Sequence, residues 1–344
     1  VSMDNCARNG EKLRAGVLSM ARGWAERGLV ESAFLDWLED EGRVSFPWSM
    51  IDKITPHPSE RVQEELGRLG VADMAIARTN TGTLIAPFVN AEITEYLVLE
   101  DAFPNGRPAL EGAGVYLTDR TTVEKAEKMK VGTCLNPLHT ALAVYGCLLG
   151  YTSIAAEMGD ADLKALVEHI AAESLPVVED PGILSPRAFI DEVLHERFPN
   201  PAIPDTPQRI AADTSQKLPV RYGGTLRRYA RQSEQALAGL EFAPLVFAGW
   251  CRYLLGVDDR GNAMPVSPDP MLPQLQAHLK GIEVGRPDSL AGQLRPILSN
   301  AALFGVDLYA AGLGERTEEM FRDMLAGPGA VRATLHRNCV CKQP

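Results

Sequence analysis

"KMKVGTCLNPLHTALAVYGCLLGY", residues 128–151, combines a polar front end with an apolar second half. The second half, 141–149, is apolar enough for a buried helix but far shorter than the ~18–20 residues of a membrane span. Asn136 and Pro137 predict where the helix starts, because Asn is a favoured N-cap and Pro suits the first helical position. We therefore predict a core helix over 136–150 whose first turn carries polar side chains.

Three polar residues, Lys130, Asn136 and His139, stand at this front end. Oxidation of a secondary alcohol needs a base for the hydroxyl proton and donors for the developing oxyanion. A lysine whose pKa is lowered by burial can act as the base, an Asn amide can donate, and a His can orient the hydroxyl. The pattern thus suits metal-free alcohol–carbonyl chemistry. The alternative is structural: a helix cap, a buried histidine and a cation at a helix end.

Composition excludes several classes of protein. The 344 residues are 45% hydrophobic and 23% charged, the mix of a soluble globular protein with room for one large domain or two smaller ones. The net charge of −11 argues against a nucleic-acid surface, and no apolar run is long enough to span a membrane. Six scattered cysteines predict a reduced, cytoplasmic protein. A metal site at Cys339 and Cys341 is the alternative for the closest cysteine pair.

Hydrophobic periodicity predicts a mainly α-helical chain with a small strand-bearing insert. Strands are expected over 96–103 and 112–119, and a proline-punctuated loop over 44–60. No strand is followed by G-x-G-x-x-G, so the chain shows no dinucleotide-binding motif. The expected helices are 8–28, 31–42, 59–69, 121–130, 136–150, 160–172, 185–197, 222–240, 243–255, 270–281, 288–302 and 315–326.

Five separated segments stand out along the chain: "SMDNCARNGEKLR" (2–14), "FPWSMIDKITP" (46–56), "EDAFPNGRPALEGAGV" (100–115), "LNPLHTALAVYGCLLGY" (135–151) and "RFPNPAIPDTPQRIAADTSQKLP" (197–219). In this order, over nearly the whole chain, they resemble the long-chain polyol dehydrogenases, the family of mannitol 2-dehydrogenase, fructuronate reductase (mannonate oxidoreductase) and tagaturonate reductase. Several motifs in the right order are far more specific than any one of them.

The resemblance implies a domain organisation. In this family an N-terminal Rossmann-type domain binds NAD(P), and a mostly helical substrate domain follows. This chain begins at Val1 without an initiator Met, near the junction motif. We therefore expect the Rossmann domain to be missing, residues 1–45 to be a junction segment and 46–344 to be the mostly helical C-terminal substrate and catalytic domain. NAD or NADP would be bound mainly by the missing domain, no metal would be needed, and the isolated chain would be inactive.

The resemblance also implies four catalytic residues. Lys130 matches the family's general base in oxidation and acid in reduction. Asn136 and Asn5 match the two asparagines that stabilise the oxyanion. His139 matches the histidine that positions the substrate and the lysine. The structural alternative for Asn5 is a turn or helix-cap residue.

Three further residues match substrate-binding positions of the family. Asp52 matches an acidic residue of the active site, and Arg209 and Lys217 match basic residues that reach the substrate. A sugar acid would give Arg209 a role, because a guanidinium binds a carboxylate through two hydrogen bonds. The alternatives are an Asp52–Lys53 pair and a surface ion pair for Arg209.

The spacing between Lys130 and Asn136 departs from the family pattern. Five residues separate them, where the mannitol enzymes are expected to have four. Either a one-residue bulge takes up the difference or the lysine sits differently, with Lys128 as the replacement.

These observations favour an NAD(P)-dependent oxidoreductase of carbohydrate metabolism that interconverts fructuronate and mannonate. Mannitol 2-dehydrogenase is the second reading within the family. A non-catalytic helical binding module and a metal-dependent alcohol dehydrogenase are the alternatives from other classes. The expected partner is a small sugar acid or polyol, with no nucleic acid and no membrane.

Overall fold

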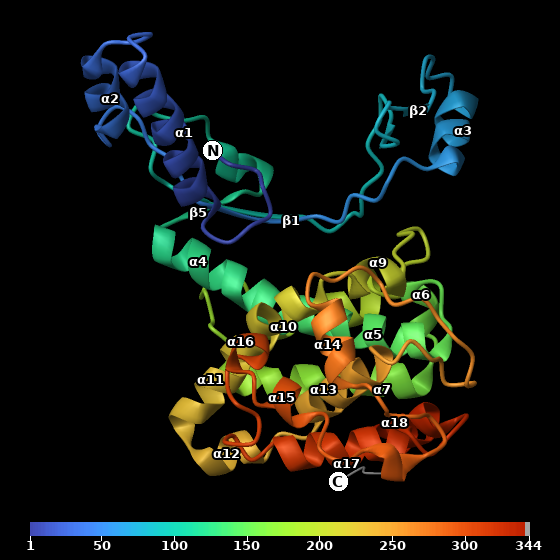
Figure 1. Ribbon diagram of the computed structural model, residues 1–344. Helices are drawn as coiled ribbons and strands as arrows, with labels where there is room; N and C mark the ends of the chain where they lie inside the picture. Colours follow the sequence, from blue (N-terminus) through green and yellow to red (C-terminus); the bar gives the residue numbers. More distant parts are fainter. Residues whose placement is uncertain (341–344) are drawn as a thin grey trace. The chain divides into compact units, whose positions relative to one another are not determined.

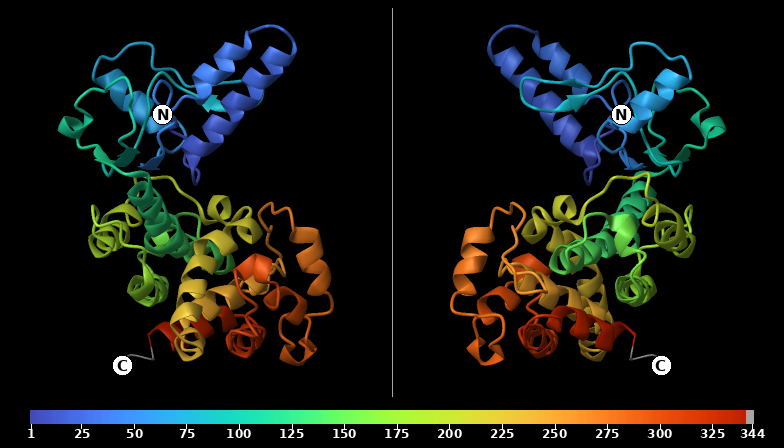
Figure 2. Two further views of the ribbon diagram at one scale, coloured as in Figure 1. Left: turned by 90° about the vertical axis from the view of Figure 1, so that its left-hand side faces the viewer. Right: turned by 90° about the vertical axis from the view of Figure 1, so that its right-hand side faces the viewer.

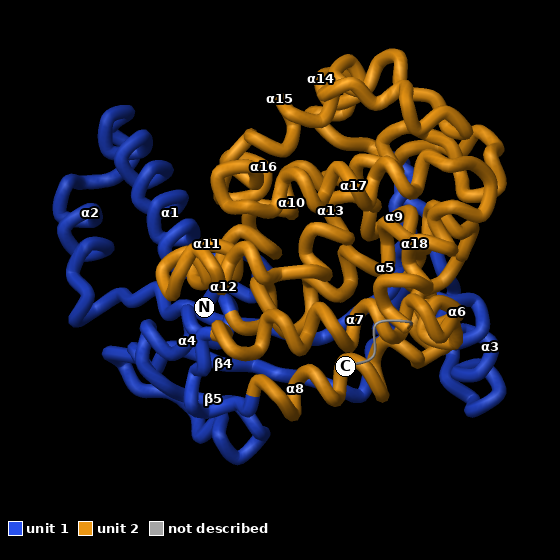
Figure 3. The backbone as a smooth tube through the Cα atoms, turned by 90° about the horizontal axis from the view of Figure 1, so that it is seen from below, with its two compact units in different colours: residues 1–128, 179–185 blue, residues 129–178, 186–344 orange. Residues whose placement is uncertain are grey.

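The structure, a computed structural model, describes residues 1–340 and divides into two compact units. Figure 3 shows the first unit, residues 1–128 with 179–185, and the second, residues 129–178 with those from 186 onward.

The first unit combines helices with two small sheets. Its helices are α1 (Asn9–Glu26), α2 (Ser32–Glu39), α3 (Glu60–Arg68), the 3-10 helix η1 (Leu110–Ala113) and α4 (Arg120–Met129), which ends at the boundary. Its strands are β1 (Ser49–Asp52), β2 (Ala77–Arg78), β3 (Leu84–Ile85), β4 (Tyr96–Glu100) and β5 (Tyr116–Thr118).

The larger sheet has the strand order β1-β4-β5, with β1 antiparallel to β4 and β4 parallel to β5. Asn9 ties the start of α1 to this sheet: its amide donates to Ser49 Oγ at 2.7 Å, and its Oδ1 accepts from Ser49 N at 3.0 Å. Because α1 and β1 are joined in this way, the expected junction segment 1–45 lies inside the first unit. The compact units divide between residues 128 and 129.

Helices α1 and α2 pack against each other as a hairpin (Figure 2). Their contact is a small apolar core formed by Leu18, Ala21 and Leu38, with Phe34 packed against it. These residues recur at helical spacing, which explains why both helices were predictable from periodicity.

The second unit is helical (Figure 1). Its elements are the π-helix η2 (Lys130–Cys134), α5 (Asn136–Leu149), α6 (Ile154–Glu157), α7 (Ala161–Ser174), η3 (Leu175–Val177), α8 (Pro186–Glu192), the π-helix η4 (Val193–Arg197), α9 (Pro207–Ala211), α10 (Thr214–Arg221), α11 (Gly223–Gln232), α12 (Glu234–Ala238), α13 (Phe242–Tyr253), α14 (Leu272–His278), η5 (Pro287–Ser289), α15 (Arg295–Leu298), α16 (Ala301–Phe304), α17 (Gly314–Met324) and α18 (Ala330–Cys339).

The core of this unit is built on α5 and α13, each buried along almost its whole length. A helix that is apolar on every side must be surrounded by other elements. The two helices approach closely at Gly249, where an added Cβ would lie 2.7 Å from the Tyr145 ring. Tyr145 Oη donates to Leu245 O at 2.8 Å, which satisfies the one polar group of this buried side chain. The predicted core helix over 136–150 is therefore confirmed.

Three regions differ from the expectations. The proline-punctuated loop contains β1, a short strand that depends on pairing with the distant β4. The helix expected over 222–240 breaks at Ser233, whose Oγ accepts from Ala236 N at 3.0 Å and starts α12. The helix expected over 288–302 is reduced to short pieces, α15 and α16, because Asn300 caps a new helix there.

Several helices were not expected, among them α6, α9, α10 and α18. Pro207 occupies the first turn of α9, where a proline suits a helix. α18 lies beyond the last expected helix. In residues 1–340, no helix has the length and apolar character needed to cross a membrane.

Candidate active site

The segment between α4 and α5 is a π-helix, Lys130–Cys134, closed by Leu135 N donating to Lys130 O at 3.1 Å. A π-helical turn contains one residue more than an α-helical turn. This geometry supports the one-residue bulge as the explanation of the unusual spacing. Lys130 is only 2% exposed, whereas the side chain of Lys128 is 43% exposed and lies 3.3 Å from Glu124. The structure therefore favours Lys130 over Lys128 as the candidate for the catalytic lysine.

Asn136 begins α5, but it does not cap the helix. Leu135 occupies the N-cap position, and no side chain makes a capping bond there. The prediction that Asn136 is the cap is therefore wrong by one residue. Its amide side chain has no hydrogen-bond partner among residues 1–340, and the residue is only partly buried. A carboxamide in this position can donate to a ligand.

His139 lies on the same first turn and contacts Asp205. Its Nε2 is 3.1 Å from Asp205 Oδ2, an ion-pair distance with an angle outside the range of a hydrogen bond. Burial lowers the pKa of His139, and the contact with Asp205 offsets only part of that effect. The imidazole is therefore neutral near pH 7. Assigning its proton to Nε2, toward the carboxylate, leaves Nδ1 as an acceptor with no partner in the described part of the chain.

Asp205 is the one acidic side chain that the structure places beside His139. Its Oδ1 accepts from Arg209 Nε at 2.8 Å and lies 2.7 Å from Arg209 Nη2. Burial raises the pKa of Asp205, but the contacts with His139 and Arg209 outweigh burial and hold it below its ordinary value. Our sequence reasoning missed this residue. The signal was its position four residues before Arg209, which favours an ion pair across one helical turn.

The two basic residues expected from the resemblance lie on consecutive short helices. Arg209 is on α9, and its side chain is 60% exposed. Lys217 is on α10, and its Nζ donates to Ile210 O at 3.0 Å and to Ala212 O. Burial lowers the pKa of Lys217 to about 8. Asp213, in the left-handed conformation with φ 53°, separates the two helices.

Arg221, the last residue of α10, is a third cation of this cluster and was not predicted. Its Nη1 donates to Thr140 Oγ1 at 2.5 Å and to Asn136 O at 3.4 Å. The neighbouring Tyr222 donates through its hydroxyl to Pro137 O at 2.7 Å. These bonds hold the end of α10 against the first turn of α5.

Asn5 and Asp52 belong to the first unit, whereas Lys130, Asn136 and His139 belong to the second. Asn5 is exposed in the segment before α1, and Asp52 is buried at the end of β1. Lys53, the alternative ion-pair partner of Asp52, pairs with Glu95 instead, with its Nζ 2.8 Å from Glu95 Oε2. That Asn5 and Asp52 join the other site residues remains a prediction.

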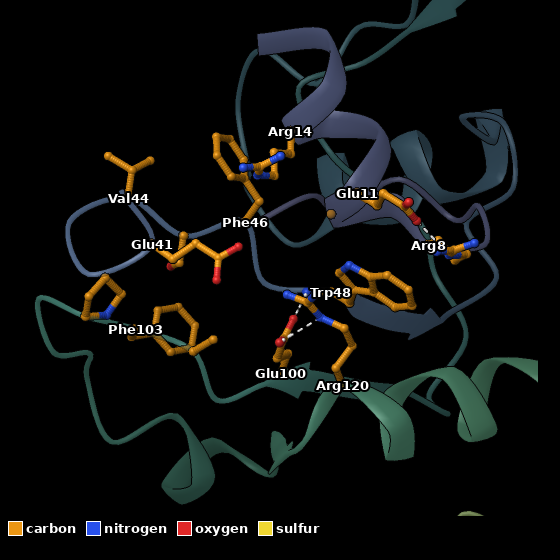
Figure 4. A pocket seen from close by; sticks show the side chains of 14 residues that line it. Arg8, Glu11, Arg14, Glu41, Val44, Phe46, Trp48, Glu100, Phe103 and Arg120 are labelled. Atoms are coloured by element: carbon orange, nitrogen blue, oxygen red, sulfur yellow. Dashed lines mark hydrogen bonds and ion pairs between the residues drawn. The ribbon is translucent and has the colours of Figure 1, made fainter. Parts of the chain in front are cut away.

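The first unit also has a pocket of about 620 Å³ (Figure 4). Two guanidinium groups, those of Arg8 and Arg120, each lie 5.2 Å from the centroid of the Trp48 ring. Glu100 accepts from Arg120 Nε at 2.9 Å and from Trp48 N at 3.0 Å. None of the predicted catalytic or substrate-binding residues lines this pocket.

The described residues do not form a dinucleotide cradle. The parallel strands β4 and β5 are joined by residues 101–115, which contain only the 3-10 helix η1, so no glycine-rich turn leads into a crossover helix. Within residues 1–340, no three His, Cys, Asp or Glu side chains are grouped closely enough to hold a metal ion. Cys339 is buried, and Cys341, the other half of the alternative metal site, lies outside the described residues.

The chain is similar to one described protein family and to several known oxidoreductases. The family described as "Mannitol dehydrogenase C-terminal domain" matches residues 122–316. A D-mannonate oxidoreductase of Thermotoga maritima is 56% identical over 337 residues, which cover 97% of this chain and 62% of that protein. A D-mannonate oxidoreductase of Escherichia coli K12 is 32% identical over 311 residues, which cover 90% of this chain and 57% of that protein. This chain thus spans less than two thirds of the length of either relative.

Solved structures agree with the fold. The Pseudomonas fluorescens mannitol 2-dehydrogenase, in a ternary complex with NAD and D-mannitol, matches 100% of this chain and 62% of its own chain, with a TM-score of 0.71 and 30% sequence identity. A D-sorbitol dehydrogenase in substrate-free form matches with a TM-score of 0.76 at 24% identity, which supports the fold alone. The expected architecture of the helical unit is therefore confirmed.

Proposed function

Because this chain belongs to the mannitol dehydrogenase C-terminal domain family, we propose that the protein is an NAD(P)-dependent oxidoreductase that interconverts D-mannonate and fructuronate. The 56% identity to a D-mannonate oxidoreductase is the observation that carries this substrate assignment. Mannitol 2-dehydrogenase activity is the second candidate, supported by the 30% identity to the Pseudomonas fluorescens enzyme.

The reaction is a two-electron oxidation. A hydride leaves the carbinol carbon and a proton leaves its hydroxyl, so that the alcohol becomes a ketone. The resemblance implies NAD or NADP as the hydride acceptor. Since the described residues form no cradle for that cofactor, we assign residues on the substrate side only, and binding of the cofactor by a separate dinucleotide-binding domain remains a prediction.

Lys130 takes the hydroxyl proton during oxidation and returns it during reduction. Its position, 2% exposed in the π-helix that leads directly into the first turn of α5, supports this role, because it places the lysine on the segment that carries Asn136 and His139. The Asn136 amide donates to the substrate oxygen as negative charge develops. That amide is available because the helix cap does not use it.

His139 accepts a hydrogen bond from a substrate hydroxyl through Nδ1. The Asp205 carboxylate, 3.1 Å from Nε2, favours the tautomer with the proton on Nε2, and Asp205 also pairs with the guanidinium of Arg209. Lys217, Asn5 and Asp52 complete the proposed substrate and catalytic set on the strength of the family motifs alone. No metal is assigned a role.

A matched pair of lysine variants tests this proposal. Lys130→Met should lower kcat for mannonate oxidation by about 10²- to 10⁴-fold, the usual contribution of a positioned general base. Lys128→Met, at a partly exposed lysine two residues away, should change kcat by less than about twofold. Steady-state NADH formation by the full-length protein measures both variants.

The outcomes separate the alternatives. If Lys130→Met retains wild-type turnover while folded, the acid–base assignment is wrong. If the wild-type protein has no turnover with any sugar acid or polyol, the non-catalytic binding module is supported. If activity and one equivalent of zinc are lost together on chelation, the metal-dependent alternative is correct.

A further inference from the structure

Arg221 differs from Arg209, which pairs with Asp205, and from Lys217, which feels the charges of Asp213 and Asp269, because no carboxylate acts on it in the described residues. Of its nitrogens, only Nη1 has partners in residues 1–340, namely the Thr140 hydroxyl and the Asn136 carbonyl. Both partners are neutral. The side chain is partly buried, and burial lowers the pKa of Arg221 to about 10. A guanidinium with this much desolvation normally has an anionic partner.

Arg209 shows the contrast. Two of its nitrogens contact Asp205 Oδ1, at 2.8 and 2.7 Å, so its charge is already compensated. Its side chain is also mostly exposed, which weakens any further interaction through solvent screening. Arg209 was the residue expected to bind a substrate carboxylate. The structure makes Arg221 the better candidate for that task.

The carboxylates near His139 are unevenly shared among three cations. Asp205 pairs with Arg209, and the charges of Asp213 and Asp269 act on Lys217, whereas no carboxylate acts on Arg221. Burial lowers the pKa of Lys217 first, and the charge of Arg221 lowers it further. The same charge helps to lower the pKa of His139. Arg221 is therefore the cation of this cluster whose charge is left for an anionic ligand.

We propose that Arg221 binds the carboxylate of the substrate and thereby selects sugar acids over neutral polyols and ketoses. The planar guanidinium fork matches the two oxygens of a carboxylate, and Nε and Nη2 are not used by the described residues. This inference rests on the proposed function, because it requires a hexuronate substrate.

The geometry gives this arginine a fixed position relative to the reacting groups. Thr140 Oγ1 donates to Asn136 O at 3.0 Å and accepts from Arg221, so the guanidinium is held on the turn that carries Asn136 and His139. In fructuronate the carbonyl carbon and the carboxyl carbon are four bonds apart. One substrate molecule can therefore reach the amide of Asn136 and the guanidinium together.

The test compares an acid with its neutral counterpart. Fructose is fructuronate with a hydroxymethyl group in place of the carboxylate. For Arg221→Gln in the full-length protein, kcat/KM for fructuronate should fall on the order of 10- to 100-fold, mainly through KM, as expected for loss of a charged hydrogen bond. For fructose it should change by less than about threefold. Arg231→Gln, at an exposed arginine of α11, is the matched control and should leave both values unchanged.

A second measurement does not depend on turnover. D-mannonate should raise the melting temperature of the wild-type protein and of Arg231→Gln, and this shift should be lost in Arg221→Gln and partly retained in Arg221→Lys. An equal loss of kcat/KM for both sugars would show a structural role and overturn the inference while the proposed function stands. A wild-type protein that reduces fructose but not fructuronate would overturn the proposed substrate, and the inference with it.

Discussion

Glu157, the last residue of α6, should make the protein less stable as the pH rises. Its side chain is fully buried at 0% exposure, and neither carboxyl oxygen has a hydrogen-bond partner in residues 1–340. The carboxyl fills the space beside Gly146 of α5, where an added Cβ would lie 1.9 Å from Oε1. Burial raises the pKa of Glu157 to about 9, and the charges of Asp205 and Asp160 contribute.

The magnitude follows from linkage between protonation and folding. The ordinary pKa is 4.5 and the folded pKa is about 9, so the folded state holds a proton that the unfolded state has released between these values. The stabilisation is fully present below about pH 4.5 and is lost as the pH rises through about 9. Each pH unit in this window costs about 1.4 kcal/mol. Between pH 6 and pH 8 the free energy of unfolding should therefore fall by up to about 3 kcal/mol.

Urea unfolding of the wild-type protein and of Glu157→Gln at pH 6, 7 and 8 measures this effect. Glutamine has no proton to lose, so the variant should gain stability relative to wild type as the pH rises, by up to about 3 kcal/mol over this range. A stability difference between the two proteins that stays constant from pH 6 to pH 8 would refute the reasoning about this buried carboxyl.

Two more substitutions test the packing of the site and of the core. Asp205→Asn should lower the free energy of unfolding by about 2 kcal/mol, because it removes a charged partner of an exposed arginine and of a buried imidazole. The value of kcat/KM should also fall, because the Asp205 charge no longer favours one tautomer of His139. An unchanged free energy of unfolding in urea together with an unchanged kcat/KM would contradict this expectation. Gly249→Ala should lower the free energy of unfolding by about 1–3 kcal/mol, because its methyl group would overlap the Tyr145 ring. A melting temperature equal to that of wild type would show that α5 and α13 can move apart without loss of stability.

The sequence predicted the parts of the fold that depend on local patterns. α5 was predictable because its apolar run is long, begins at Asn136-Pro137 and ends at a glycine, Gly150, in the left-handed conformation. The π-helix that contains Lys130 was foreseen only as a bulge, since a π turn has no characteristic residue pattern. The strand β1 was missed because four residues carry too little pattern without their partner strand.

Family motifs supplied the predicted site residues, whose roles stay predictions, whereas residues that meet the site only through tertiary contacts were not foreseen. Asp205 and Arg221 were missed because the contact that brings each into the site is with a residue far away in the sequence. His139 is 66 positions from Asp205, and Thr140 is 81 positions from Arg221. The folded arrangement of α5, α9 and α10 brings these pairs together, and nothing in their local sequence describes that packing.

The most direct test of the proposed function is the rate of NADH formation by the full-length protein with D-mannonate and with D-mannitol at equal concentrations. We expect kcat/KM for D-mannonate to exceed that for D-mannitol by at least about tenfold, as a charged hydrogen bond to the carboxylate would give. A higher kcat/KM for D-mannitol would contradict the proposed substrate and identify the protein as a polyol dehydrogenase instead.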